Sequence, residues 1–318
     1  MTQTTLTEGD QPLPGPRAIG VIGLGIMGSL YARHLIEAGY DVAGFDVAAD
    51  RCEEFAAAGG RLCTSTAEVV DRAVVVVIAL SSVAAFRSVM LAADAASHHA
   101  RAGQIFLEMG TLSIALKDQA RHVLEQRGAH LVDAPVTGTR IHAERKELVV
   151  YASGNEEVIA EARPVLEAFA RDVRFVGDFG TGMKLKMVTN HLVAVHNVAA
   201  AEALAFAARA GLDLRRVYDL IAGGPASSAV FGFRGPLMIE ARYHPPTMRM
   251  DVFEKDLQII DEFATALHAA TPLFQASLGV YREALAQGMT SEDVAATFEI
   301  LKARGTTSPP AVTPARPG

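Results

Sequence analysis

The stretch "AIGVIGLGIMGSLYARHLIEAGYDVAGFD", residues 18–46, decides how the first half of the chain folds. An apolar run leads into Gly23, Gly25 and Gly28, spaced G-x-G-x-x-G, and a helical pattern follows as far as Gly39. In such a strand-to-helix turn, the first glycine permits the bend, the second admits a pyrophosphate and the third lets helix and strand pack closely. The alternatives are a mobile loop or a purely structural turn. The context predicts a dinucleotide site that includes the helix-opening residues Ile26 and Met27.

An acidic residue closes the next predicted strand, "DVAGFD". Asp46 lies 23 residues after Gly23, where a carboxylate is placed to accept hydrogen bonds from the adenosine ribose. A carboxylate there repels a 2′-phosphate, and no arginine follows at once, because Val47, Ala48 and Ala49 come next. The sequence therefore predicts NAD as cofactor in preference to NADP. The alternative is a solvated acid that merely ends a strand.

Composition limits the possible partners. The 318 residues are 50% hydrophobic and 20% charged, which suits a globular protein of about two domains. The formal net charge is −7, with lysine and arginine scattered along the chain, so we expect no nucleic-acid partner. Cys52 and Cys63 are too few for a disulfide framework, although a single bridge remains open. These features favour a cytoplasmic protein.

Both ends of the chain lack apolar periodicity. Residues 1–16 hold three prolines and no basic residue, unlike a secretory or transit leader, and residues 304–318 are also rich in proline. We expect disordered tails at both ends. The longest apolar run, "AVVVVIAL" at 73–80, is far shorter than the roughly 20 residues that cross a bilayer, so no membrane association is predicted.

Between the tails, the pattern changes once. From residue 17 to 178, short β-branched runs alternate with helical segments, which is typical of βαβ units around a mostly parallel sheet. From 179 to 303 the spacing is helical throughout. We therefore predict an α/β protein with two domains: a Rossmann-type doubly wound dinucleotide-binding domain at 17–178 and an all-α substrate and dimerisation domain at 179–303. The predicted strands are 18–24, 41–46, 61–64, 74–80, 105–110, 130–136, 148–153 and 173–176.

Four motifs occur together in a recognisable order. They are "GLGIMG" at 23–28, "DAPVTGT" at 133–139, "GTGMKLKMVTN" at 180–190 and "FEKDLQII" at 253–260. This combination resembles the β-hydroxyacid dehydrogenase family, which includes 3-hydroxyisobutyrate dehydrogenases, and the resemblance extends over about residues 17–302. It implies a nicotinamide-dependent oxidoreductase that acts on a short hydroxy acid. It also implies that the protein forms a homodimer or a homotetramer.

The third motif carries the predicted catalytic residue. The resemblance implies that Lys186 is the general acid and base and that Asn190 binds the substrate. Positions i and i+4 share one face of a helix, so these two side chains can converge on one ligand. Lys184 lies about 200° around the helix from Lys186 and is the weaker candidate.

The resemblance also implies a carboxylate-binding turn at Thr137, Gly138 and Thr139. Thr139 departs from the family, which has glycine there, and this departure leaves the substrate open. Ala229 stands about where the family carries a tryptophan, so Phe231 or Phe233 is expected to complete the substrate pocket.

Further cofactor contacts follow from the same resemblance or from fold position. Leu80 and Ser81 follow a predicted strand at its carboxyl end, where cofactors lie in such folds, and Ser82 is next to them. Thr111 matches a family threonine beside the nicotinamide, preceded here by Gly110 in place of serine. Lys255 resembles a lysine of the cofactor site, with a charge on the wet helix face as the alternative.

These residues imply reversible hydride transfer between the cofactor and a 3-hydroxy carboxylate. A 6-phosphogluconate dehydrogenase would carry a glutamate where Val193 stands, and an imine reductase usually replaces the lysine that is present here as Lys186. A non-catalytic dinucleotide-binding module is the alternative from another class. The ten histidines have no metal-like spacing, and adjacent His98 and His99 suit a surface loop, so no metal is predicted.

Overall fold

The protein consists of two compact units, which a computed structural model describes over residues 18–304. The first unit extends to Lys186 and the second begins at Met187, so the boundary falls inside one long helix, α8 (Thr181–Arg209). This boundary lies a few residues beyond the change of pattern seen in the sequence. The predicted tails at 1–16 and 304–318 lie outside the described residues except for Arg304, which is the last residue of a helix.

A six-stranded parallel sheet forms the centre of the first unit. Its strands are β1 (Ala18–Ile22), β2 (Asp41–Phe45), β3 (Arg61–Leu62), β4 (Val75–Ile78), β5 (Ile105–Glu108) and β6 (His130–Asp133). They lie in the order β3-β2-β1-β4-β5-β6, and every pairing is parallel. The predicted doubly wound sheet is confirmed. The strand order reverses between β1 and β4, and ligands of such sheets bind at the carboxyl side of this switch point.

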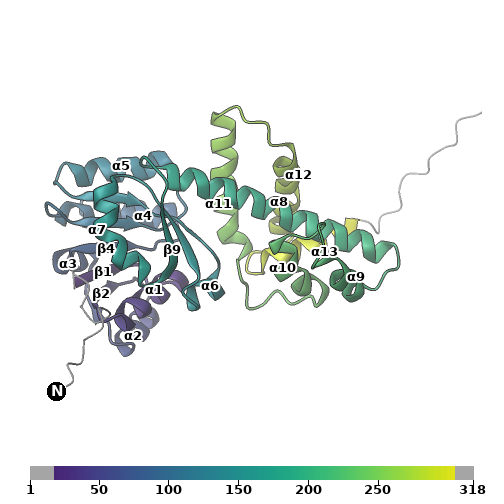
Figure 1. Cartoon of the computed structure of the whole chain (residues 1–318), viewed down its shortest axis with the longest axis horizontal. Coiled ribbons are helices and arrows are strands. Elements are labelled where there is room, and N and C mark those ends of the chain that lie inside the picture. Colours follow the sequence, from purple (N-terminus) through teal and green to yellow (C-terminus); the bar gives the residue numbers. More distant parts are fainter. Residues whose placement is uncertain (1–17, 305–318) are drawn as a thin grey trace, which may run out of the picture. The chain divides into compact units, whose positions relative to one another are not determined.

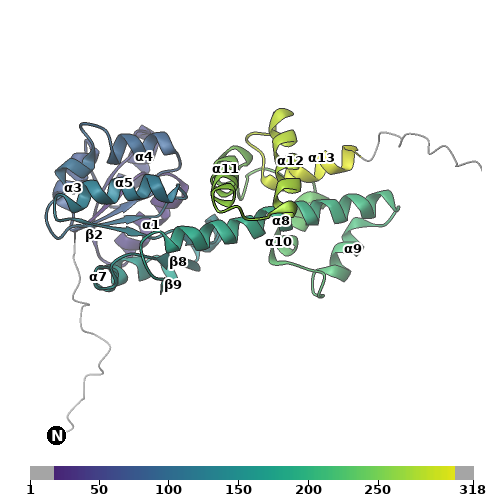
Figure 2. The same ribbon diagram turned by 90° about the horizontal axis from the view of Figure 1, so that it is seen from above.

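Helices cover both faces of this sheet, because alternate strand residues point to opposite sides (Figure 2). Val77 and Leu107 pack on the α1 side, whereas Ile78 and Phe106 pack against the helices of the other side. The helices on the two faces of the sheet are α1 (Ile26–Glu37), α2 (Ala49–Ala57), α3 (Thr66–Arg72), α4 (Val83–Met90) and α5 (Ile114–Glu125), with a 3₁₀ turn η1 (Ala96–His99).

The sequence predicts one strand at 130–136, but the structure divides it. β6 ends at Asp133, and β7 (Val136–Thr137) begins a second sheet with β8 (Leu148–Ala152) and β9 (Ala170–Phe175). Pro135 lies between them; proline has no N–H to donate to a ladder, and here its carbonyl accepts from Tyr151 N at 3.0 Å. Helices α6 (Arg140–Glu144) and α7 (Glu156–Glu167) accompany this sheet.

The second unit is helical, and no strand occurs between residues 181 and 304 (Figure 1). Its elements after α8 are α9 (Leu214–Ile221), α10 (Ala229–Ile239), α11 (Met250–Ala266), α12 (Pro272–Ala286), η2 (Val294–Ala296) and α13 (Thr297–Arg304). Small side chains of α8, among them Ala200 and Ala201, share a core with Met238 of α10 and Phe298 of α13. The predicted all-α second half is confirmed.

Helix α8 is long and apolar enough to cross a bilayer by length and composition alone. Its most apolar window is 44% buried inside the protein. The core helix of a soluble protein passes the same test, so this feature by itself does not indicate a membrane segment.

Candidate active site

The glycine turn between β1 and α1 has the geometry that a pyrophosphate requires. Gly23 has a φ of +92°, and a Cβ on Gly28 would lie 1.8 Å from the Gly23 carbonyl oxygen. By contrast, a Cβ on Gly25 would have only one atom within 4 Å, Arg51 Nη1 at 3.4 Å, so this glycine faces open space. Helix α1 opens here without a side-chain cap and with no acid in its first turn. Its amide N–H groups and positive dipole end therefore suit a bound phosphate.

The turns that follow β1, β4 and β5 lie side by side at the carboxyl edge of the sheet. The Leu80 side chain reaches 3.0 Å from the Cβ position of Gly23, and the Leu80 carbonyl oxygen lies 3.1 Å from that of Gly110. Thr111 follows directly, half-buried, and Ser81 is exposed. The structure thus brings Gly23, Leu80 and Gly110 together, with Ser81 and Thr111 next to them in the sequence. Lys255 belongs to the second unit.

Gly110, which departs from the family pattern, and Ser82, which follows Ser81, both have local structural reasons. A Cβ on Gly110 would lie 2.7 Å from Glu108 Oε1, so the serine common in the family does not fit beside this glutamate. Ser82 caps α4, because its hydroxyl accepts a hydrogen bond from Ala85 N at 3.1 Å.

Asp46 is held firmly by its own chain. Its carboxylate accepts from Leu24 N at 2.7 Å and from Ala48 N at 2.9 Å, and its side chain is only 7% exposed. Arg51, in the first turn of α2, places Nη1 3.6 Å from Asp46 Oδ2. Arg51 is not among the residues predicted above, because that expectation covered only the residues directly after Asp46. The signal was present, since Arg51 lies in the first turn of the helix that follows the strand.

The glycines of the G-x-G-x-x-x-K motif let α8 start against the sheets. Gly180 has a φ of +88°, and a Cβ on Gly182 would lie 2.3 Å from the Tyr151 carbonyl oxygen. Met183 N donates to Asp133 Oδ2 at 2.8 Å, and Gly182 N donates to Ser153 Oγ at 3.0 Å. These bonds satisfy amides that a helix leaves free at its start.

This anchored turn places the predicted catalytic lysine. Met183 and Met187 are buried and Lys184 is exposed, whereas Lys186 is half-buried. The motif thus separates the two lysines by burial as well as by angle.

Within the second unit, Asn190 is part of a small polar cluster that the sequence analysis did not assign. Asn190 Nδ2 donates to Asp256 Oδ2 at 2.9 Å, and Lys255 Nζ lies 2.9 Å from Asp256 Oδ1. Asp256 is buried, so it fixes the orientation of the Asn190 amide and the position of the Lys255 ammonium. Its adjacency to Lys255 in the sequence was the available signal.

The predicted carboxylate-binding turn follows β7. Gly138 has a φ of +127°, and a Cβ there would lie 2.6 Å from a Leu148 methyl group, which explains the glycine. Thr139 caps α6, with its hydroxyl 2.9 Å from His142 Nδ1 and its backbone N–H donating to the same nitrogen at 3.1 Å. The side chain that replaces the family's glycine therefore has a structural role. Thr137 is half-buried beside it.

Phe231 is one of the two phenylalanines expected to complete the substrate pocket. It is 5% exposed, belongs to the core of the helical unit and stacks on Tyr218 at 5.5 Å between ring centroids. Phe233 is 40% exposed on the same helix. The periodicity of α10 explains the difference, since positions two apart on a helix face different directions. Phe233 is therefore the accessible candidate of the two.

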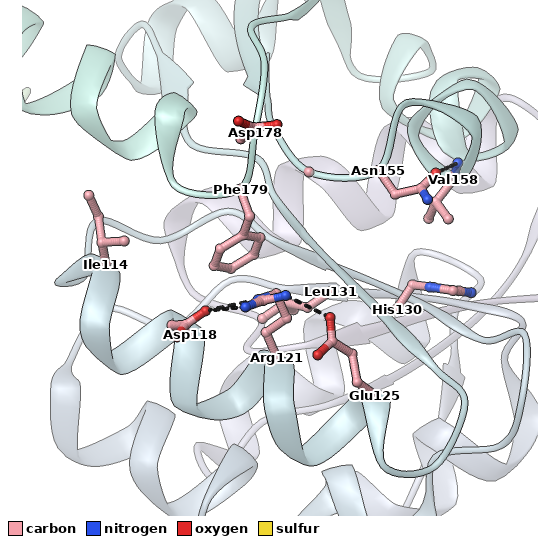
Figure 3. A pocket seen from close by; sticks show the side chains of 11 residues that line it. Ile114, Asp118, Arg121, Glu125, His130, Leu131, Asn155, Val158, Asp178 and Phe179 are labelled. Atoms are coloured by element: carbon pink, nitrogen blue, oxygen red, sulfur yellow. Dashed lines mark hydrogen bonds and ion pairs between the residues drawn. The ribbon is translucent and has the colours of Figure 1, made fainter.

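Other possible sites carry little chemistry. Cys52 and Cys63 are both free thiols, so the single bridge left open by the sequence does not form. No group of three or more metal-ligating side chains occurs within residues 18–304. Figure 3 shows a pocket beside α5, and none of the predicted site residues lines it. In this pocket Arg121 donates hydrogen bonds to Asp118 and Glu125. Its guanidinium also lies over the Phe179 ring, so its charge is already compensated.

Comparisons with known proteins place the chain. Residues 18–177 match a family model described as the NAD binding domain of 6-phosphogluconate dehydrogenase. Residues 180–301 match a second model, described as the NAD-binding region of NADP-dependent 3-hydroxyisobutyrate dehydrogenase. The L-threonate dehydrogenase of Cupriavidus necator is 32% identical over 90% of this chain and 96% of that protein. Mouse mitochondrial 3-hydroxyisobutyrate dehydrogenase is 28% identical over 89% of this chain and 87% of that protein.

Solved structures agree with these matches. The crystal structure of a 3-hydroxyisobutyrate dehydrogenase from Salmonella typhimurium has a TM-score of 0.81 and 32% identity, covering 89% of this chain and 99% of that one. A Mycobacterium tuberculosis 3-hydroxyisobutyrate dehydrogenase with L-serine has the same TM-score at 27% identity, covering 89% and 98%. An imine reductase from Myxococcus stipitatus, at 19% identity and a TM-score of 0.62, covering 90% of this chain and 100% of that one, shares the fold alone.

The doubly wound sheet and its glycine turn define a dinucleotide-binding enzyme of the Rossmann type, followed by a helical unit. The chain belongs to the β-hydroxyacid dehydrogenase family, as its motifs predict.

Removing the Asp256 carboxylate should disturb both of its partners. In Asp256→Leu, we expect kcat/KM for a hydroxy acid substrate to fall at least about tenfold, because small displacements of positioning groups cost catalysis heavily. Asp256→Asn keeps an oxygen acceptor for Asn190 Nδ2, so its kcat/KM should fall less. Steady-state kinetics below the melting temperature measure the effect, with exposed Glu254→Leu on the same helix as control. Equal activity in Asp256→Leu and the control would exclude a positioning role.

Proposed function

We propose that the protein is an NAD-dependent dehydrogenase of short 3-hydroxy carboxylates, with Lys186 as general acid and base. The observation that carries this proposal is the start of α8, where Asp133 and Ser153 hold the first turn and Lys186 and Asn190 follow one turn apart. An anchored helix presents an ammonium and a carboxamide to one ligand with little freedom.

Each residue of the proposed site has one task. Lys186 Nζ takes the proton from the substrate hydroxyl during oxidation and returns it to the carbonyl oxygen during reduction. Asn190, with its amide fixed by Asp256, orients that oxygen. A nicotinamide dinucleotide held at the glycine turn and Asp46 would supply the hydride chemistry. The remaining residues hold the two reactants in place.

The second end of the substrate is assigned to the turn after β7. The Thr137 hydroxyl and the Gly138 backbone N–H are donors suited to a carboxylate. Because these donors and Lys186 belong to separate segments, a molecule with a carboxylate at one end and a hydroxyl on the β-carbon satisfies both. A simple alcohol would leave the carboxylate donors without a partner.

NAD is proposed as the preferred cofactor because Asp46 presents a carboxylate at the end of β2. A carboxylate has about four acceptor positions, so two remain for ribose hydroxyls beside the two backbone bonds. Arg51 supplies an opposing feature, since a guanidinium near the ribose suits a 2′-phosphate. In the structure it is paired with Asp46, which reduces the charge that it offers to a phosphate.

Two alternative functions are weaker. The imine reductases that resemble this chain share the fold alone, and the lysine that they usually replace is present as Lys186. A non-catalytic dinucleotide-binding module has no need for the Asn190–Asp256–Lys255 cluster.

We also propose that the protein is cytoplasmic, binds neither membranes nor nucleic acid, and forms a homodimer or homotetramer. Exposed apolar side chains of the helical unit, Phe206, Leu220 and Leu273, support self-association. Sedimentation velocity of the full chain measures the oligomeric state, and a monomer at micromolar concentration would contradict this proposal.

The substrate class is tested by comparing specificity constants for 3-hydroxypropionate, lactate and 1-propanol, with NAD and NADP in parallel. We expect the 3-hydroxy acid to exceed both others at least about tenfold, because a site built on hydrogen bonds rejects analogues that leave its donors unpaired. L-threonate and 3-hydroxyisobutyrate, named for relatives, extend the panel to larger acids. Equal or faster turnover of 1-propanol or lactate would refute the two-ended binding of the substrate.

The role of Lys186 is tested by Lys186→Met. Loss of a general acid and base should lower kcat at least about 10²-fold, while NADH affinity, measured by fluorescence, should barely change. Lys184→Met, two residues away on the exposed side of α8, is the matched control and should retain activity. Full activity in Lys186→Met would move the catalytic role to another residue, with Lys255 the first to examine.

Cofactor choice is tested by Asp46→Asn. Removing the charge should shift the ratio of specificity constants toward NADP by about one to three decades, since repulsion of the 2′-phosphate disappears and Arg51 loses its partner. Adding Arg51→Leu to Asp46→Asn should cancel part of this gain. A wild-type enzyme that already prefers NADP, or an unchanged ratio in Asp46→Asn, would show that Asp46 does not select the cofactor.

A further inference from the structure

Three charged side chains are fully buried at the carboxyl edge of the parallel sheet. Glu108 ends β5 and Asp133 ends β6, and the two residues are register partners on adjacent strands. Lys117, on α5, inserts its ammonium between them, with Nζ 2.5 Å from Glu108 Oε2 and 2.7 Å from Asp133 Oδ1. None of the three side chains has measurable solvent exposure. Lys117 belongs to none of the four sequence motifs.

Lys117 holds this cluster together electrostatically. Burial alone lowers the pKa of its ammonium, but the carboxylates of Asp133 and Glu108 outweigh burial and raise that pKa, so the ammonium stays charged. Burial raises the pKa of Glu108, with Asp133 adding to the effect and Lys117 opposing it. The Tyr31 hydroxyl, on α1, is buried near Glu108, and its pKa is also raised. Without Lys117 the two adjacent carboxylates would face each other in a site closed to water.

One side of the cluster extends to the loop proposed to contact the nicotinamide. Glu108 Oε1 accepts a hydrogen bond from Gly110 N at 2.9 Å, immediately before Thr111. The close approach of this oxygen is also what excludes a side chain at Gly110. The position of the Thr111 backbone is therefore tied to the Glu108 carboxylate.

The other side extends to the helix that carries Lys186. Asp133 Oδ2 accepts from Met183 N at 2.8 Å and from Ser153 Oγ at 2.9 Å, and Ser153 Oγ accepts in turn from Gly182 N at 3.0 Å. Lys186 lies three residues beyond Met183, on nearly the same side of α8. Movement of Asp133 would therefore shift or rotate the turn that presents Lys186.

We propose that Lys117 is a positioning residue for hydride transfer: by clamping Glu108 to Asp133, it fixes the Thr111 loop and the Lys186 turn relative to each other. This inference rests on the role proposed above for Lys186 and on the contact with the nicotinamide that the family resemblance implies for Thr111. Stability alone does not explain the buried ion cluster, because apolar residues of similar volume often stabilise a core equally well. What apolar residues would not supply is the chain of directional bonds from Gly110 N to Met183 N.

Two variants test the clamp, because Lys117→Met alone leaves two buried carboxylates without their cation and could fail to fold. The double variant Glu108→Gln/Lys117→Met removes one negative and one positive charge together and keeps an oxygen acceptor for Gly110 N. Lys146→Met, at an exposed lysine of the same unit, is the control. Each protein is assayed as the full chain, well below its melting temperature.

We expect kcat to fall at least about tenfold in both clamp variants, with KM for the dinucleotide changed less than about threefold, since alignment is lost while the glycine turn and Asp46 remain. Hydrogen exchange measured by mass spectrometry should rise together in peptides covering 105–117 and 180–187, and remain unchanged in Lys146→Met. If Lys117→Met does not fold, the double variant alone decides.

Wild-type kcat in a folded clamp variant, whatever its melting temperature, would overturn the proposal and leave Lys117 a structural residue. Faster exchange in only one of the two peptides would also overturn it, because the clamp must couple both. The exchange measurement needs no substrate. A wild-type protein that oxidises no hydroxy acid therefore refutes the proposed function, while the exchange data still show whether Lys117 links the two segments.

Discussion

The hydrogen bond from Met183 N to Asp133 Oδ2 is the interaction on which the arrangement of the proposed active site depends. A helix start leaves backbone N–H groups without partners, and a buried carboxylate satisfies them while favouring the positive end of the helix dipole. Because Asp133 also ends β6, the bond fixes the first turn of α8 to the parallel sheet of the first unit. The half-buried position of Lys186 follows from this attachment.

Close approach of backbones is the second constraint, and glycine makes it possible at two turns. At Gly28 the helix that follows β1 comes so near the preceding turn that any side chain would overlap a carbonyl oxygen, and at Gly182 the same holds for α8 and β8. Each glycine thus places a helix N-terminus against the carboxyl edge of a strand. One N-terminus suits a phosphate, whereas the amides of the other are occupied by Ser153 and Asp133.

Local pattern was sufficient to predict the class of fold, the glycine turn, most strand positions and the helical second half, because each depends on spacing of 2 or 3.6 residues or on a short turn. The last strand, predicted at 173–176, begins earlier, at Ala170. The strand predicted at 130–136 is divided at Pro135, and Phe231, one of two phenylalanines expected to complete the substrate pocket, lies in the core of the helical unit. The proline explains the first difference, and the helical period explains why Phe231 and Phe233 face different directions. The roles of Lys186, Thr137, Gly138 and Thr111 remain predictions.

The sequence by itself determined the parallel sheet with its dinucleotide turn, the acid at the end of β2 and the family, since these features lie within short continuous stretches. Only the tertiary structure decided that Asp256 holds Asn190 and that Lys117 joins Glu108 to Asp133. Ion pairs and hydrogen bonds between residues far apart in the chain, such as the 66 positions between Asn190 and Asp256, have no periodic signature. They exist because burial leaves charged and polar groups in need of a partner, and folding determines which partner is within reach.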